Sequence, residues 1–286
     1  MMKNKKWILA LLALVTLGLA GFAYQSVSGQ GAKELNKKDF IQSTRPTLFF
    51  HGYGSSARAE EHMTSAAREA GVTKTIIRAN VDRNGQVTLS GKIPKGAINP
   101  IVQVNYEDNR NPDFPKDASY AKAIVSKLQE LYHFQEMNMV GHSMGNMSIL
   151  YYLLEHSQDE GLPQLQKQVN IANHVNGLEG MDLPEGLTLD AQTGQPNKMS
   201  RNYQTLLGLR EIYPQEQVDV LNIYGDYKNG SDGSVLNSSS LSLKYLLVDN
   251  AKSYQEKKIT GPLAQHSKLH ENPEVDKVLI DFLWGK

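Results

Sequence analysis

The sequence predicts an α/β protein with a mostly parallel central sheet and helices on both of its faces. Short apolar runs of strand length recur along the chain, and segments with apolar residues at helical spacing lie between them. Such alternation is typical of parallel sheets, because a parallel connection needs a crossover that is usually a helix. The chain has 286 residues, of which 40% are hydrophobic and 21% charged. It is therefore long enough to bury a large core.

The N-terminal segment, residues 1–23, differs from the rest of the chain. Three lysines precede residues 7–23, an apolar run without a charged side chain. A basic start followed by an apolar stretch is typical of an export signal. If it is not cleaved, a run of this length is at the lower limit for crossing a bilayer. We therefore predict an exported protein, extracellular or at the cell surface, with residues 7–23 as its membrane attachment if they are retained.

Charge and cysteine content narrow the classes of function. Thirty Lys and Arg residues balance thirty acids, and the N-terminal segment holds three of the basic residues and no acid, so the remainder has a net charge of −3. This balance argues against nucleic acid as a partner. The absence of cysteine excludes thiolate catalysis, disulfides and cysteine-bound metal. We expect no metal and no organic cofactor.

The predicted domain, residues 45–286, follows a polar stretch, residues 24–44, which we interpret as a tether. Strands are expected at residues 47–50, 75–79, 101–106, 137–140, 169–172, 218–224 and 253–259, the last of them exposed. Helices are expected at residues 118–132, 144–156, 203–212 and 275–283. Asn84-Gly85 predicts a hairpin turn. Residues 177–214, rich in Gly, Pro, Asn and Gln, are predicted to be a lid-like insertion.

The strongest motif for chemistry is Gly-His-Ser-Met-Gly at residues 141–145, between a predicted strand and a predicted helix. It matches the G-x-S-x-G turn that presents a nucleophilic serine, here Ser143, at the end of a sheet. The glycines on either side allow the strand and the helix to approach closely. The alternative interpretation is a strand-to-helix turn with a capping serine.

A nucleophilic serine needs an acid and a histidine, which follow it in that order in folds of this kind. His266 lies in a loop between the last predicted strand and the closing helix, from which it could reach Ser143, and His270 is the second choice. Asp226 ends a predicted strand, and Asp232 lies in the loop beyond it. We favour Asp232, because its longer reach suits a histidine on the neighbouring loop, but spacing alone leaves both pairs open.

Stabilisation of a tetrahedral oxyanion requires two backbone N–H donors. One usually comes from a loop after an early strand and the other from the residue after the nucleophile. Tyr53, in the His-Gly-Tyr-Gly loop at residues 51–54, and Met144 occupy those places. We therefore predict that their backbone amides form the oxyanion hole.

These residues resemble the α/β-hydrolase superfamily, and more closely a family of exported α/β-hydrolases of Gram-positive bacteria known as cell-surface hydrolases. The resemblance extends from about residue 46 to residue 284. The matching stretches are FHGYGS at 50–55, GHSMGN at 141–146, SDG at 231–233 followed by Val235, HS at 266–267 and LHEN at 269–272. The resemblance implies an α/β-hydrolase fold and a triad of Ser143, Asp232 and His266, and it implies little about the substrate.

Three functions are consistent with this sequence. The first is an exported esterase or lipase-like serine hydrolase that cleaves a small-molecule or lipid ester through an acyl-enzyme. The second uses the same chemistry to transfer the acyl group to an envelope lipid or glycan. The third is a surface binding module that keeps the scaffold without turnover. The presence of every triad residue type in the expected order favours the first over the third.

Overall fold

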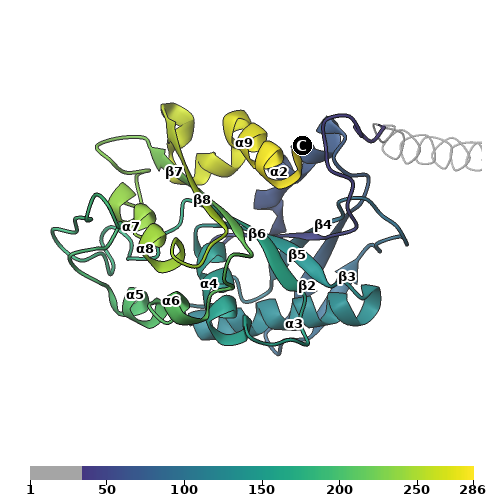
Figure 1. The fold of residues 1–286 in the computed structure, drawn as a ribbon, viewed down its shortest axis with the longest axis horizontal. Coiled ribbons are helices and arrows are strands. Elements are labelled where there is room, and N and C mark those ends of the chain that lie inside the picture. Colours follow the sequence, from purple (N-terminus) through teal and green to yellow (C-terminus); the bar gives the residue numbers. More distant parts are fainter. Residues whose placement is uncertain (1–33) are drawn as a thin grey trace, which may run out of the picture. The chain divides into compact units, whose positions relative to one another are not determined.

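Eight strands of the described chain form one sheet in the order β3-β2-β4-β1-β5-β6-β7-β8 (Figure 1). The computed structural model describes residues 34–286, so the predicted export signal lies outside the described residues. Within residues 34–286, no helix is long and apolar enough to cross a membrane. All neighbouring strands are parallel except β2 and β3. These two form the predicted hairpin, in which Gly85 takes a positive φ of 82°.

Each of the seven predicted strands is present, although β6 begins five residues before its predicted start. The strands are β1 (Thr47–Phe50), β2 (Ile76–Val81), β3 (Val87–Ser90), β4 (Ile101–Tyr106), β5 (Glu136–His142), β6 (Gln164–Ile171), β7 (Asp219–Asp226) and β8 (Ser253–Thr260). The α-helices are α2 (Glu61–Ala70), α3 (Phe114–Tyr132), α4 (Met144–His156), α5 (Arg201–Leu206), α6 (Leu209–Ile212), α7 (Asn237–Leu241), α8 (Leu243–Leu247) and α9 (Pro273–Trp284). Short 3-10 helices are η1 (Ala57–Glu60), η2 (Pro262–Ala264) and η3 (His266–Glu271).

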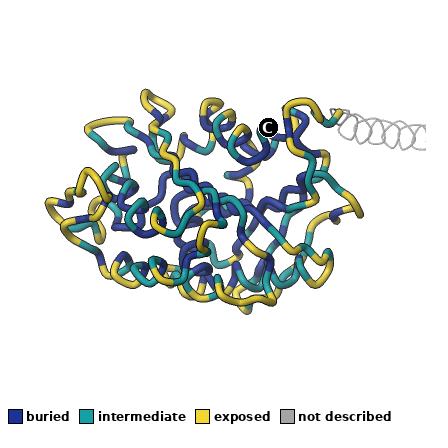
Figure 2. The backbone as a smooth tube through the Cα atoms, in the orientation of Figure 1, coloured by how far each residue is buried: buried dark blue, intermediate teal, exposed yellow. Residues whose placement is uncertain are grey.

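The sheet separates two hydrophobic cores, because successive side chains of a strand point to opposite faces. In β1, Leu48 and Phe50 join the core beneath α3 and α4, whereas Phe49 joins the core beneath α2 and α9. In β5, Met139 and Val140 divide in the same way. Figure 1 shows α9 and α2 on one face of the sheet and α3, α5 and α6 on the other. The strands between these layers form the buried centre of the molecule (Figure 2). The two-sided α/β architecture is therefore confirmed.

Several helix assignments from the sequence need correction. Helix α2 was not predicted, because its buried face consists of Met63, Thr64 and Ala67, which form a weak apolar pattern. Helix α3 begins at Phe114, where the Asp113 side chain accepts a hydrogen bond from the Lys116 N–H. The helix predicted at residues 203–212 is two short helices, α5 and α6. Helix α7 was missed because its serine-rich sequence does not favour a helix, and helix α8 because five residues are too few to show helical periodicity.

The predicted tether, residues 24–44, overlaps the start of the folded domain. Phe40 is 8% exposed and lies in the core beneath α2 and α9. It forms a β-bridge with Gly285, and the neighbouring Ile41 N–H donates to the Trp284 carbonyl at 2.8 Å. The folded domain therefore begins near residue 35 and not at 45, because an aromatic side chain from the polar stretch completes the core beside the C-terminal helix.

We expect Phe40→Ala to lower the free energy of unfolding by about 3 kcal/mol, since removing a buried phenylalanine costs contacts and leaves a cavity. Ile41→Ala is the matched control, because Ile41 is the adjacent large apolar residue and is 43% exposed. Urea denaturation of residues 24–286 of both variants measures the difference. Equal stabilities for the two variants would show that residues 35–44 are a tether after all.

Candidate active site

The carboxyl ends of β5, β7 and β8 lie at the same edge of the sheet, because these strands are parallel to the strands beside them. Ser143 follows β5 directly, Asp232 lies in the loop after β7, and His266 opens η3 beyond β8. Three segments that are far apart in the sequence thus reach one place. This is where ligands bind in open α/β sheets.

The turn at Ser143 is strained and tightly packed. Ser143 has φ 52° and ψ −120°, a conformation that non-glycine residues rarely adopt. A Cβ atom on Gly145 would lie 2.1 Å from the Phe50 carbonyl oxygen, and one on Gly141 would lie 2.7 Å from the Asn146 nitrogen. Both positions therefore require glycine. The strain is sustained by the surrounding contacts and directs the serine side chain away from the sheet.

Asn146 holds this turn from inside. Its side-chain amide donates to the carbonyls of Ser143 and Ile171, both at 2.9 Å. The Ser143 N–H also donates to the Ile171 carbonyl at 3.0 Å. The turn is thereby fixed to the end of β6. Sequence reasoning assigned no role to Asn146, although it follows the motif directly.

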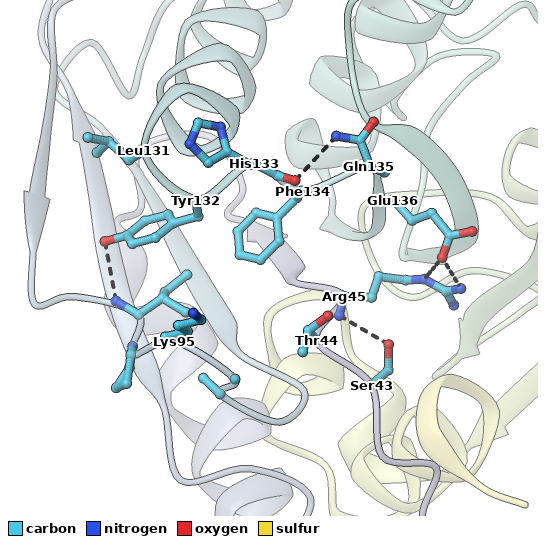
Figure 3. Close-up of a pocket in the computed structure, with 14 residues that line it drawn as sticks. Ser43, Thr44, Arg45, Lys95, Leu131, Tyr132, His133, Phe134, Gln135 and Glu136 are labelled. Atoms are coloured by element: carbon cyan, nitrogen blue, oxygen red, sulfur yellow. Dashed lines mark hydrogen bonds and ion pairs between the residues drawn. The ribbon is translucent and has the colours of Figure 1, made fainter.

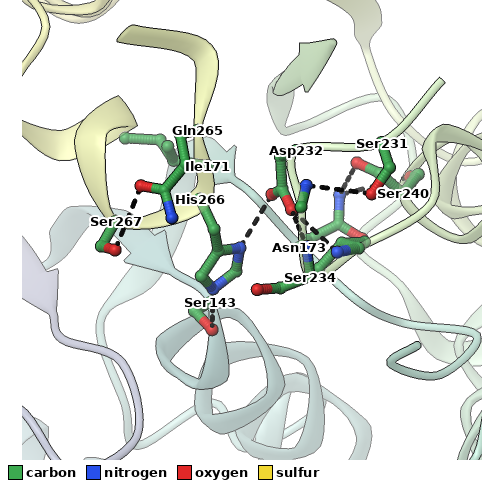
Figure 4. A network of polar contacts seen from close by, with 12 residues as sticks. Ser143, Ile171, Asn173, Ser231, Asp232, Ser234, Ser240, Gln265, His266 and Ser267 are labelled. Atoms are coloured by element: carbon green, nitrogen blue, oxygen red, sulfur yellow. Dashed lines mark hydrogen bonds and ion pairs between the residues drawn. The ribbon is translucent and has the colours of Figure 1, made fainter. Parts of the chain in front are cut away.

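Ser143, His266 and Asp232 form one chain of hydrogen bonds (Figure 4). His266 Nε2 lies 2.9 Å from Ser143 Oγ, and His266 Nδ1 lies 2.8 Å from Asp232 Oδ2. Asp232 and Ser143 are 1% and 8% exposed, so water competes little for these bonds. With Asp232 ionised, Nδ1 carries the proton and Nε2 is free to accept one from the serine.

The loop around Asp232 fixes both the carboxylate and the histidine. Asp232 Oδ1 accepts from the N–H groups of Ser234 and Val235 at 2.9 and 2.7 Å. The Asp232 carbonyl accepts from the His266 N–H at 2.9 Å. The two residues are thus joined through main chain and side chain, which sets the orientation of the imidazole.

The alternative acid and histidine have other partners. Asp226 Oδ2 lies 2.6 Å from Lys258 Nζ, and Asp226 Oδ1 accepts from the Gly230 N–H. The hydrogen bond with Lys258 lowers the pKa of Asp226, whose role in the structure is to hold the loop after β7. His270 packs edge-on against His142 at 4.7 Å between ring centroids and makes no hydrogen bond to Ser143 or Asp232. Of these candidates, Asp232 and His266 are the pair that the structure brings into one chain of hydrogen bonds with Ser143.

A buried network of amides and hydroxyls supports the loop after β7. The Asn173 side chain donates to Asn222 Oδ1 at 2.6 Å and to Ser240 Oγ at 3.0 Å. Asn222 also donates to the Ser240 carbonyl. The network joins the end of β6, the middle of β7 and helix α7, and Figure 4 shows Asn173 and Ser240 close to the loop of Asp232. Its residues are dispersed in the sequence, where nothing distinguishes them from asparagines and serines of surface loops.

The loop after β1 lies against Ser143. A Cβ atom on Gly52 would be 3.1 Å from Ser143 Cβ, so the backbone approaches the serine closely. His51 holds this loop: its Nε2 accepts from the Tyr106 N–H at 3.2 Å, and its Nδ1 donates to the Gly52 carbonyl. Among the described residues, no hydrogen bond occupies the backbone N–H of Tyr53 or Met144. Both predicted oxyanion donors are therefore available beside Ser143.

His142 connects both sides of the site. Its Nε2 lies 3.0 Å from the His266 carbonyl oxygen, to which it donates, and its Nδ1 lies 3.2 Å from where a Cβ on Gly52 would be. Burial, followed by the nearby imidazoles of His266 and His270, holds the pKa of His142 well below its ordinary value. A neutral imidazole thus packs between the loop after β1 and the loop of His266.

Ser143 and His266 line a cleft of about 470 Å³, whereas Asp232 is buried behind His266. Its walls include Tyr53 from the loop after β1, and Leu178, Glu179 and Met181 from the insertion. A larger pocket, of about 760 Å³, lies near the amino ends of β1 and β5, where Arg45 pairs with Glu136 (Figure 3). That pocket contains none of the predicted site residues.

Comparison with known families identifies the fold family. Residues 34–286 match the model of a family described as alpha/beta hydrolase of unknown function, DUF915. The chain belongs to this family. The match covers the whole described domain, and the family's description as alpha/beta hydrolases agrees with the sheet order and the turn at Ser143. No curated protein matches the sequence.

Solved structures give the same fold. A protein of Listeria innocua is 26% identical and has a TM-score of 0.75, with 84% of this chain and 94% of that chain covered. A Lactobacillus plantarum protein, provisionally named a cell surface hydrolase, is 21% identical and has a TM-score of 0.67, with 84% and 89% covered. A Pyrococcus furiosus esterase is 13% identical and has a TM-score of 0.50, with 87% and 89% covered.

We expect His142→Phe to reduce the reactivity of Ser143 roughly tenfold or more. The substitution removes the hydrogen-bond donor to the His266 carbonyl, so the loop that positions His266 loses a support. The measurement is the rate of labelling by a fluorophosphonate that reacts with activated serines. His142→Gln keeps a donor and should recover most of the rate. Equal rates for wild type and His142→Phe, with both proteins folded, would show that the contact does not position His266.

Proposed function

We propose that the protein is an exported serine hydrolase that cleaves carboxylic esters. The observation that carries this proposal is the hydrogen-bonded chain from Ser143 Oγ through the His266 imidazole to Asp232, at 2.9 and 2.8 Å. Membership of an alpha/beta-hydrolase family supports hydrolytic chemistry. The basic and apolar N-terminus, together with the provisional cell-surface name of the Lactobacillus plantarum protein, supports export.

In the proposed reaction, Ser143 Oγ attacks the ester carbonyl carbon while His266 Nε2 takes the serine proton. Asp232 keeps the Nδ1 proton on the opposite side of the ring and stabilises the imidazolium. The negative charge that develops on the carbonyl oxygen is stabilised by the free N–H groups of Tyr53 and Met144. Met144 begins α4, so the positive end of the helix dipole adds to this stabilisation.

The tetrahedral intermediate collapses when His266 donates its proton to the leaving alkoxide, which departs as the alcohol. A water molecule then gives a proton to His266 and attacks the acyl-enzyme, and a second collapse releases the acid and restores Ser143. The residues present are sufficient for both halves of this cycle. We expect Leu178 and Met181 of the insertion to influence which acyl or alcohol group fits, because they line the cleft.

We expect Asp232→Asn to lower kcat for a 4-nitrophenyl ester by about 10³-fold or more, because the imidazole loses the charge that orients and stabilises it. Asp226→Asn is the matched control, since it neutralises the other aspartate after β7 and should keep most of the activity. Steady-state hydrolysis by residues 24–286 measures both variants. Similar losses in the two variants would refute the assignment of Asp232.

Ser143→Ala gives the test of the reaction class. A fluorophosphonate should label the wild-type protein, and mass spectrometry should place the adduct on Ser143, with no label in Ser143→Ala. Folded wild-type protein that neither takes up the label nor hydrolyses any ester in an acyl-chain-length series would overturn the proposal and favour a binding module.

A further inference from the structure

Within residues 34–286, the walls of the cleft carry one carboxylate and no lysine or arginine. The lining residues are Gly52, Tyr53, Ser55, His142, Ser143, Leu178, Glu179, Met181, Gly233, Ser234, His266, Ser267 and His270. Burial keeps the pKa of His142 and of His270 below the ordinary value, so neither adds a positive charge at neutral pH. The fixed charge on the described wall is therefore negative, and it belongs to Glu179.

Glu179 is held in place from two sides. Its Oε2 accepts a hydrogen bond from Ser231 Oγ at 2.5 Å, and its N–H donates to the Ser234 carbonyl at 3.1 Å. Ser231 and Ser234 flank Asp232 in the loop after β7. The beginning of the insertion is thereby fixed to the loop that orients His266, and the carboxylate has a defined place in the wall of the cleft that Ser143 also lines.

Nearby cations leave this carboxylate unneutralised. Among residues 34–286, Glu179 forms no ion pair. Lys268, which follows the lining residue Ser267 in the sequence, pairs with Glu271. The Arg110 side chain touches the loop after β1 at Gly54 and does not line the cleft. A substrate group beside Glu179 therefore meets an unpaired negative charge.

The large apolar side chains of the wall are open to solvent. Met181 is 80% exposed and Tyr53 is 59% exposed, and both line the cleft together with Leu178. Large apolar side chains that stay exposed around a concave site are typical of a binding surface. They offer an apolar contact to a substrate, while Glu179 sets the preferred sign of its charge.

We propose that Glu179 makes the cleft selective for neutral and cationic esters, with an apolar part that lies on Leu178, Met181 and Tyr53, and that it disfavours anionic esters. This inference rests on the proposed esterase function. In a solvent-open cleft, one negative charge changes the ratio of the rates for a cationic and an anionic substrate roughly fivefold, in favour of the cationic one. The effect weakens as salt screens the charge. The same charge repels the acid product and so assists its release.

The test compares three butyrate esters that differ in the charge of the alcohol: the choline ester, its uncharged 3,3-dimethylbutyl analogue and the 2-sulfoethyl ester. In wild type at low ionic strength we expect kcat/KM to decrease from the choline ester to the sulfoethyl ester. In Glu179→Gln the ratio of these two rates should fall roughly fivefold, and the neutral ester should change little. The glutamine can still accept the Ser231 hydrogen bond, so the loop keeps its support.

Glu185→Gln is the matched control, because Glu185 is an exposed carboxylate of the same insertion and does not line the cleft. It should leave the ratio unchanged, and Glu179→Lys should reverse the preference. If wild type hydrolyses the neutral ester but the charge ratio is the same in Glu179→Gln, the selectivity inference is overturned and the esterase proposal stands. If wild type hydrolyses none of the three esters and is not labelled at Ser143, the proposed function itself fails.

Discussion

The close approach of the turn after β5 to the end of β1 is the constraint on which the site depends. A side chain at Gly145 would overlap the Phe50 carbonyl oxygen, at 2.1 Å, so the backbones touch there without room for any other residue. This contact brings helix α4 directly behind Ser143. It also places the loop after β1, and with it the Tyr53 amide, beside the serine. The strained φ of Ser143 lies in the same turn and is maintained by this packing.

A second close contact brings the histidine into place. A Cβ atom on Gly225, in the last part of β7, would lie 2.0 Å from the Ala264 carbonyl oxygen. The segment before His266 therefore passes directly over the end of β7, where Asp232 meets it through both main chain and side chain. His142 then ties the His266 carbonyl back to the turn of Ser143. The loop of His266 is thus joined both to the loop of Asp232 and to the turn of Ser143, so a shift of His266 would be opposed from two sides.

The sequence was sufficient for those features that depend on local pattern. Strands buried on both faces appear in the sequence as short apolar runs. The close backbone approach at the turn of Ser143 requires glycines at fixed positions, a pattern that few other turns share. Pattern did not predict α2, whose buried face is small, or the packing of Phe40, whose partners Gly285 and Trp284 lie at the other end of the chain. A single aromatic residue in a polar stretch carries no periodicity.

Residues that act through tertiary contacts were also beyond local pattern. Spacing left Asp226 and Asp232 as alternatives, because both follow the same strand within a few residues. What separates them is the partner that each finds: Lys258 for Asp226, and His266 for Asp232. Asn173, Asn222 and Ser240 meet only after β6, β7 and α7 have assembled. Their buried amides and hydroxyls satisfy one another's hydrogen-bonding capacity. Asparagine and serine are also common in surface loops, so the sequence does not reveal this network.

The insertion at residues 177–214 divides into two parts with different physical roles. Its first residues, Leu178 to Met181, border the cleft and are fixed to the loop of Asp232. Its later part forms α5 and α6, where Tyr203, Leu206 and Leu209 are buried in the core shared with α4. A segment anchored in the core at one end and hydrogen-bonded beside Asp232 at the other has little freedom to swing as a whole. Variation of substrate preference within such a domain would therefore come from the few side chains at its beginning, with Glu179 contributing charge and Met181 an apolar surface.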